Sequence, residues 1–226
     1  MDILSEKFYF NPFVRLWIRL SCRMSRSRDA RLDKKICGQS LGRFVPSPYA
    51  DNYGATGSQS VSYAGLEEIM NRVSLEEGDS FIDIGCGKGR VLAYLMASGC
   101  KAHITGIELN PDVASVASSW AKDHPDIKII CGNAFDIDFD SYTHLFMYRP
   151  MDLFTFISFI RKLEGSLSHS ITLIYYADIE AGTFLEERKN WDVIARDKVF
   201  YKDGYFIHLE PQRYSIYEYT PQSSKE

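Results

Sequence analysis

The sequence is short of the features that mark metal, disulfide and membrane proteins. Its five cysteines are scattered without a Cys-x-x-Cys pair, and its five histidines stand singly, so we expect no metal site and free thiols in a reducing cytoplasm. No apolar run reaches the ~18 residues of a transmembrane span. The first residues lack the apolar core and cleavage site of a signal peptide. A chain of 226 residues with this composition predicts one cytoplasmic globular domain with an appendage.

Acidic residues are scarce at the start of the chain. Residues 1–50 carry ten Lys or Arg against four Asp or Glu, whereas residues 51–226 carry sixteen against twenty-six. An acidic body repels phosphates, which makes it a poor candidate for binding nucleic acid. We therefore divide the chain into a basic N-terminal arm and cap loop, residues 1–60, and a main domain, residues 61–226. Contact with an anionic partner is expected through the arm.

The arm contains a predicted amphipathic helix. Asn11 and Pro12 are typical of a helix start, as N-cap and first helical residue. Apolar side chains share one face and arginines the opposite one: Phe13, Leu16, Trp17, Leu20 and Met24 against Arg15, Arg19, Arg23 and Arg26. We expect the apolar face to cover the domain or a second copy in a homodimer. The alternatives are docking onto a partner or anionic substrate, and lying on a membrane surface.

From residue 80 onward, short apolar runs alternate with helical patterns. This predicts an α/β domain with a largely parallel sheet. Strands are expected over residues 81–84, 103–107, 127–130, 143–148 and 171–175, and helices over 63–73, 90–97, 111–122, 152–163 and 180–189. The end of the chain predicts a hairpin of residues 192–201 with 205–209, and residues 213–219 extend that antiparallel edge.

The run Phe81-Ile82-Asp83-Ile84-Gly85-Cys86-Gly87-Lys88-Gly89-Arg90 joins the first strand to a helix through a glycine-rich turn. Such a turn lets a ligand lie against bare backbone. A nicotinamide site would need a third small residue where Arg90 stands. Asp83 would repel a pyrophosphate but would favour an ammonium group.

Three further strand ends complete the pattern. Glu108 follows the second strand, where an acid can accept both ribose hydroxyls. Gly132-Asn133-Ala134 follows the third and can read the edge of a purine, and Tyr148-Arg149-Pro150 follows the fourth. A ligand with a ribose, a base and an ammonium group fits these ends, and S-adenosylmethionine has all three.

These residues resemble the motifs of the class I S-adenosylmethionine-dependent methyltransferases, over roughly residues 60–220. The Lys-Gly-Arg segment is similar to a bacterial branch reminiscent of the Dot1-type fold. The resemblance implies a seven-stranded Rossmann-like sheet with a C-terminal antiparallel hairpin and an N-terminal helical cap. Carried over by position, the cofactor-binding residues that it implies are Asp83, Gly85, Gly87, Glu108, Leu109, Asn133 and Ala134. In that family Asp83 would hold the methionyl ammonium, Glu108 the ribose, and Asn133 the adenine amino group.

The fourth strand departs from the family. Several branches that methylate amino groups place Asn or Asp before Pro there, whereas this sequence has Tyr148-Arg149-Pro150-Met151. Tyr148 and Arg149 are the candidate catalytic residues, and the guanidinium suits a carboxylate or phosphate on the acceptor. The structural alternative is that Arg149 pairs with Asp152 or Asp178.

The function that the resemblance implies is methyl transfer from S-adenosylmethionine to an unidentified acceptor, with no metal required. The alternatives are an inactive S-adenosylmethionine-binding protein with a regulatory or scaffolding role, and a nicotinamide-dependent oxidoreductase. Tyr49, Tyr53 and Tyr63 are candidates for a cover over the cofactor. Candidate bases are His144 and His208, and Cys86 is expected to pack rather than to react.

Overall fold

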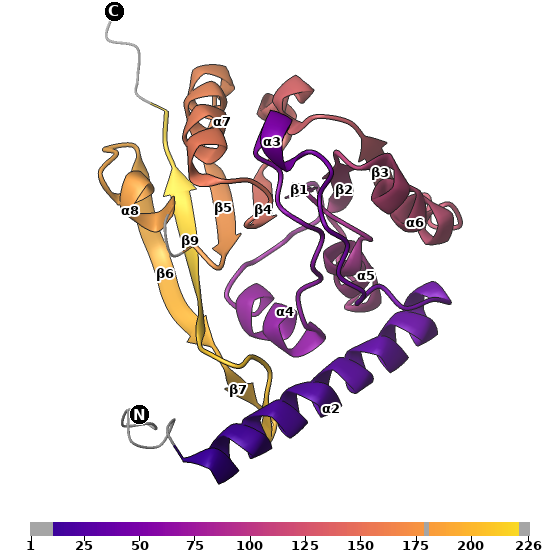
Figure 1. The fold of residues 1–226 in the computed structure, drawn as a ribbon. Helices are drawn as coiled ribbons and strands as arrows, with labels where there is room; N and C mark the ends of the chain where they lie inside the picture. Colours follow the sequence, from indigo (N-terminus) through magenta and orange to yellow (C-terminus); the bar gives the residue numbers. More distant parts are fainter. Residues whose placement is uncertain (1–10, 179–180, 222–226) are drawn as a thin grey trace, which may run out of the picture.

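One central sheet has helices on both of its faces (Figure 1). Alternating side chains of its strands are buried on the two faces. A computed structural model describes residues 11–178 and 181–221. In the sheet, the strand order is β3-β2-β1-β4-β5-β9-β6. The strands are β1 Ser80–Ile84, β2 His103–Glu108, β3 Ile127–Cys131, β4 His144–Tyr148, β5 Ile171–Tyr176, β6 Trp191–Val199 and β9 Gln212–Tyr219. The first five pair in parallel and β9 is antiparallel to both of its neighbours, which confirms the expected α/β class and seven-stranded sheet.

Helices cover the two faces of the sheet in separate cores. The helices are α2 Pro12–Cys37, α3 Ala50–Tyr53, α4 Tyr63–Met70, α5 Arg90–Ala97, α6 Pro111–Ala121, α7 Leu153–Ser166 and α8 Ala181–Glu186. One core joins α4, α5 and α6 to Phe81, Phe146 and Ile174. The other joins α7 and α8 to Ile82 and Leu145, the strand residues of opposite orientation. The period-two pattern therefore places successive strand residues in different cores. The expected start of the last helix, at residue 180, lies outside the described residues.

The predicted C-terminal antiparallel hairpin is present but shorter than expected, and the pairing predicted for residues 192–199 is wrong. β6 pairs with β9 along its whole length, and β9 lies between β5 and β6 instead of extending the edge. The turn at Asp203 and Gly204 closes a separate two-stranded sheet, β7 Tyr201–Lys202 with β8 Tyr205–Phe206. The turn signal was local and correct, but the strand partner depends on contacts between distant residues.

The arm helix α2 begins as predicted, with the Asn11 side chain accepting from the Phe13 N–H at 2.9 Å. Its orientation differs from the prediction. The face that packs on the domain consists of Ile18, Ser21, Cys22, Ser25, Asp29 and Asp33. The predicted apolar face does not cover the domain: Phe13, Leu16, Trp17, Leu20 and Met24 are exposed.

A buried ion cluster explains this orientation. The Arg90 guanidinium donates to both Asp33 carboxylate oxygens, at 2.9 and 2.6 Å, and lies 3.6 Å from Asp29. It also donates to the Val61 carbonyl and lies over the Tyr63 ring. Since Arg90 opens α5, the glycine-rich turn and the arm helix are joined by charge as well as by packing. None of the described helices is long and apolar enough to cross a membrane.

Candidate active site

The glycine-rich turn has glycine in left-handed conformation at three alternate positions. Gly85, Gly87 and Gly89 have φ values of 73°, 58° and 85°. A Cβ would also collide at each position: at Gly85 with Pro150 Cβ at 2.5 Å, at Gly87 with Ser58 Oγ at 2.7 Å, and at Gly89 with Trp120 at 2.8 Å. Both the backbone conformation and the close approach of neighbours therefore require glycine here.

Asp83 lies behind this turn, in the last part of β1. Its side chain is buried, and its Oδ2 has no hydrogen-bond partner in the described structure. Burial, and then the nearby Glu108 carboxylate, raise the pKa of Asp83 well above its usual value. A buried carboxylate oxygen without a partner is costly, and a cationic donor beside it would compensate that cost.

Glu108, at the end of β2, faces the same turn. Its Oε2 accepts from the Gly87 N–H at 2.9 Å and its Oε1 from the Asn110 N–H at 2.9 Å. Burial raises the pKa of Glu108, while these backbone donors act in the opposite direction. Two acceptor oxygens with spare lone pairs are therefore held rigidly at the strand end.

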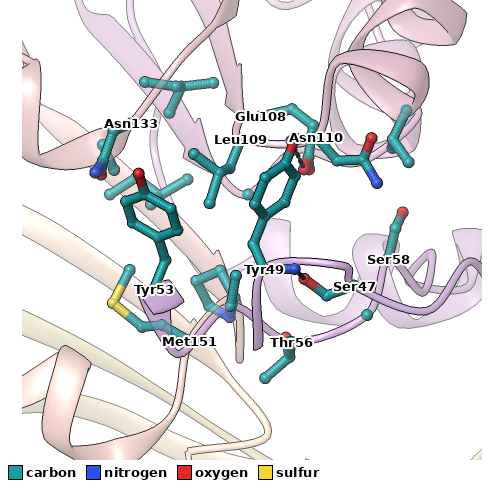
Figure 2. Close-up of a pocket in the computed structure, with 18 of the residues that line it drawn as sticks. Ser47, Tyr49, Tyr53, Thr56, Ser58, Glu108, Leu109, Asn110, Asn133 and Met151 are labelled. Carbon is teal, nitrogen blue, oxygen red and sulfur yellow. Dashed lines mark hydrogen bonds between the residues drawn. The ribbon is translucent and has the colours of Figure 1, made fainter. Parts of the chain in front are cut away.

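A cleft opens at these strand ends (Figure 2). Of the predicted residues, those that line it are Gly85, Glu108, Leu109, Asn133, Ala134 and Tyr148. Asp83, Gly87 and Arg149 are not among the lining residues. Asn133 enters through a local turn: its Oδ1 accepts from the Phe135 N–H at 3.0 Å and caps the 3-10 helix Ala134–Asp136. The capping oxygen keeps one lone pair for another donor.

The opposite wall is a cover formed by residues 45–59. Tyr49 and Tyr53 point from it into the cleft, across from Leu109 and Asn133 (Figure 2). Ser47, Thr56, Ser58, Gln59 and Asn110 also line the cleft and were not predicted. Tyr63 does not line it, because that ring packs under Arg90. The sequence signal for the cover was only a Tyr- and Ser-rich loop, which carries no information on its partner.

Hydrogen bonds tie the cover to the loop after β4. The Thr56 N–H donates to the Pro150 carbonyl at 3.0 Å, and the Thr56 hydroxyl donates to the Arg149 carbonyl. The Asp152 N–H donates to the Gly54 carbonyl at 2.8 Å. Lys88, beside the glycine turn, donates to the Arg43 carbonyl at the base of the cover. The cover is therefore positioned by the turn on one side and by the fourth strand on the other.

The ends of β4 and β5 carry aromatic side chains and strained backbone. The rings of Tyr148 and Tyr176 lie 4.8 Å apart, and Tyr176 is hydrogen-bonded to His208. Each tyrosine is followed by a non-glycine residue in left-handed conformation, Arg149 with φ 42° and Ala177 with φ 57°. Strain of this kind accumulates at functional sites.

The Arg149 side chain is exposed, and the structure describes no ion pair for it. Neither Asp152 nor Asp178, the two acids named as alternative partners, forms an ion pair with it in the described structure. Asp152 caps α7 by accepting from the Thr155 N–H at 2.8 Å. Asp178 is engaged by Arg213 at 2.6 Å and by the Tyr217 hydroxyl at 2.8 Å.

The two candidate bases and the cysteine have different surroundings. His144 begins β4 beside Thr143 and Asp79, at the end of the strand opposite the cleft. His208 is hydrogen-bonded to Tyr176, whose ring lies against Tyr148 of the cleft. Burial lowers the pKa of His208 to about 4. Cys86 is buried, and burial raises the pKa of its thiol well above its usual value, which fits packing rather than reaction.

Comparison with known proteins finds similarity to methyltransferases. Residues 81–163 match the methyltransferase domain family. The chain is 27% identical over 113 residues to an rRNA adenine N-6-methyltransferase of Lysinibacillus sphaericus, a match covering 49% of this chain and 46% of that protein. The chain spans less than half of the length of the curated relatives that it matches.

Solved structures show the same fold. A methyltransferase from Pyrococcus furiosus has a TM-score of 0.61 at 12% identity, over 89% of this chain and 99% of that one. An RNA methyltransferase from Salinibacter ruber, in complex with S-adenosyl-L-homocysteine, has a TM-score of 0.51 at 20% identity, over 71% and 93%. These solved structures, each less than 25% identical to the chain, show its fold, and residues 81–163 match the methyltransferase domain family.

Proposed function

We propose that the chain binds S-adenosylmethionine in the cleft and catalyses transfer of its methyl group to an acceptor. One observation carries the proposal: the Asp83 carboxylate is buried behind a glycine turn with one oxygen that has no partner in the described structure. An ammonium group fits that oxygen, whereas a phosphate does not. The structural role of Arg90 as the anchor of α2 also speaks against a nicotinamide site, which needs a small residue there.

The other predicted residues fit the remaining parts of the ligand. Glu108 offers acceptor oxygens to the ribose hydroxyls, and Leu109 offers an apolar surface to the adenine. Asn133 and Ala134 stand where the base edge would lie. Gly85 and Gly87 keep the approach open. When bound, the sulfonium supplies an activated methyl group, so the chain needs only to align the acceptor and exclude water. The cover with Tyr49 and Tyr53 suits the second task.

The acceptor would enter beside the end of β4. Tyr148 lines the cleft there, and the next residue is Arg149, whose side chain is exposed and whose backbone carbonyl accepts from the Thr56 hydroxyl of the cover. We infer that Tyr148 packs against the acceptor and that Arg149 binds an anionic group on it. An RNA phosphate is such a group. Because similar proteins include an rRNA and an RNA methyltransferase, the net charge of the main domain is not a sufficient reason to exclude a nucleic-acid acceptor.

Isothermal titration calorimetry tests cofactor choice first. S-adenosylmethionine and S-adenosylhomocysteine should bind, and NAD should not. Formation of S-adenosylhomocysteine is then followed with total RNA and with a mixture of small carboxylates and phosphates. Turnover with either class, lost in Arg149→Ala while cofactor affinity is kept, supports the assignment. Binding without turnover on any acceptor class would support the inactive alternative, which neither the family match nor the relatives favour.

A further inference from the structure

The outer face of α2 carries a stripe of large apolar side chains that the described domain leaves largely uncovered, although the edge of Trp17 packs against the Phe206 ring with the ring centroids 4.8 Å apart. Phe13 is 81% exposed and Trp17 48%, and the others are about half exposed: Leu16, Leu20 and Met24. Because these residues recur at helical spacing, they form one continuous strip along the first four turns. Figure 1 shows α2 lying along the outside of the molecule, with one side turned away from the sheet.

This exposure does not come from a loosely placed helix. Ser21 on the inner face accepts from the Phe206 N–H at 2.7 Å, and Ile18 and Cys22 are buried against Phe206. Farther along, Asp29 and Asp33 are held by Arg90. The inner face is therefore fixed by hydrogen bonds, apolar packing and ion pairs, which leaves the apolar stripe pointing outward.

Within α2 only arginines border the stripe, and Asp203 of the β7–β8 turn lies 3.8 Å from Arg28. Residues 12–28 contain five arginines and no aspartate or glutamate. Arg15, Arg19, Arg23 and Arg26 are exposed along one border and Arg28 along the other. A helix with Phe, Trp and Leu on one face and arginines along its borders is typical of helices that lie in a membrane interface.

We propose that this face of α2 binds the surface of an anionic phospholipid bilayer and so recruits the domain to a membrane. The arginines would contact lipid phosphates while the apolar stripe enters the boundary between headgroups and acyl chains. A second copy of the chain fits less well, because an antiparallel pair of α2 helices would bring the same arginine row of each copy together, and residues 12–28 offer no acid to neutralise it. RNA would satisfy the arginines but not the apolar stripe. The proposal does not depend on methyl transfer.

Trp17 provides a direct signal. The chain has three tryptophans, and the other two, Trp120 and Trp191, are about 5% exposed or less. A change of intrinsic emission therefore reports Trp17. The full chain is mixed with vesicles of phosphatidylglycerol and phosphatidylcholine, and with vesicles of phosphatidylcholine alone. We expect a blue shift and co-sedimentation with the anionic vesicles, and at least tenfold weaker binding to the neutral ones.

Two variants separate the contributions. Phe13→Ser should weaken binding to anionic vesicles severalfold or more. The matched control is Phe154→Ser, on the first turn of α7, where the side chain is 83% exposed; it should bind as the parent chain does. Replacing Arg15, Arg19 and Arg23 by Gln should reduce binding to anionic vesicles and remove its salt dependence. All these side chains are exposed, so melting temperatures should be unchanged.

Three results would overturn the proposal. The first is equal binding to neutral and anionic vesicles. The second is a dimer, seen in analytical ultracentrifugation, that Phe13→Ser dissociates while no vesicle binding is found. The third is binding to a homopolymeric RNA that the arginine replacements abolish and Phe13→Ser leaves intact, again without vesicle binding.

Discussion

The carboxyl ends of the strands form two groups that differ in their residue types. On the side where we propose that the methyl donor binds, the donor half at β1, β2 and β3, the turns use glycine, backbone N–H groups and short acids or amides. On the side proposed for the acceptor, the acceptor half at β4 and β5, bulky Tyr148 and Tyr176 stack, and the left-handed positions after them are occupied by Arg149 and Ala177. The donor half exposes backbone to a ligand, whereas the acceptor half presents side chains and keeps strain in its loops.

Cofactor binding by the donor half should be most sensitive to a side chain added at the glycine turn. Gly87→Val should abolish detectable binding of S-adenosylmethionine, because a branched side chain at φ 58° would occupy the approach to the turn and collide with Ser58. The matched control is Gly99→Val, also left-handed at φ 77° but with open space around it. Calorimetry should find normal affinity in the control. Normal binding by a folded Gly87→Val protein would mean that the turn does not cradle the ligand.

The acid at the end of β2 should contribute next. Glu108→Ala should weaken S-adenosylmethionine about ten- to hundredfold, since hydrogen bonds to a charged group are worth ~1.5–3 kcal/mol. Tyr148→Ala, from the acceptor half, should leave cofactor affinity within about threefold while lowering turnover. If the two variants lost cofactor affinity equally, the division between the halves would be wrong.

The stability contributed by the buried ion cluster of Arg90, Asp29 and Asp33 should depend on pH. One guanidinium faces two buried carboxylates, and burial raises the pKa of Asp29 to about 6. The native protein therefore holds a proton there that the unfolded chain has already lost, so this site's contribution to stability falls as pH rises from about 4 to about 6, by ~2 kcal/mol. Asp29→Asn should remove that fall, as measured by urea unfolding at several pH values. Parallel pH profiles of the variant and the parent would contradict it.

Replacing the two left-handed residues of the acceptor half by glycine should stabilise the protein. Arg149→Gly and Ala177→Gly both relieve left-handed strain, and each should raise the free energy of unfolding by ~0.5–1 kcal/mol. They should differ in function: Arg149→Gly should lower turnover, and Ala177→Gly, buried behind the rim, should not. Thermal melts and the rate of S-adenosylhomocysteine formation check the two expectations. Destabilisation by both changes would show that the loops are not strained.

The contrast also shows what could be predicted from the sequence. Asp83, the three glycines and Glu108 were predictable because backbone conformation and charge restrict these positions to one or two residue types. The alternation of strands and helices was predictable because it is a local pattern. The partner of β6, the packing face of α2 and the pairing of Asp33 with Arg90 were not, since each depends on residues far apart in the chain. A cover with Tyr49 and Tyr53 was expected from the resemblance, but its hydrogen bonds to residues 149–152 leave no local pattern and could not be predicted.

The central claim, that Asp83 receives a cationic group of S-adenosylmethionine, can be tested by calorimetry in two buffers of different ionisation enthalpy. The free site holds Asp83 with a raised pKa, and an ammonium beside it would favour the carboxylate. We predict proton release on binding at mildly acidic pH, an affinity that rises with pH, and loss of both effects in Asp83→Asn, together with weaker binding. Identical enthalpies in the two buffers, with unchanged affinity in Asp83→Asn, would contradict the account.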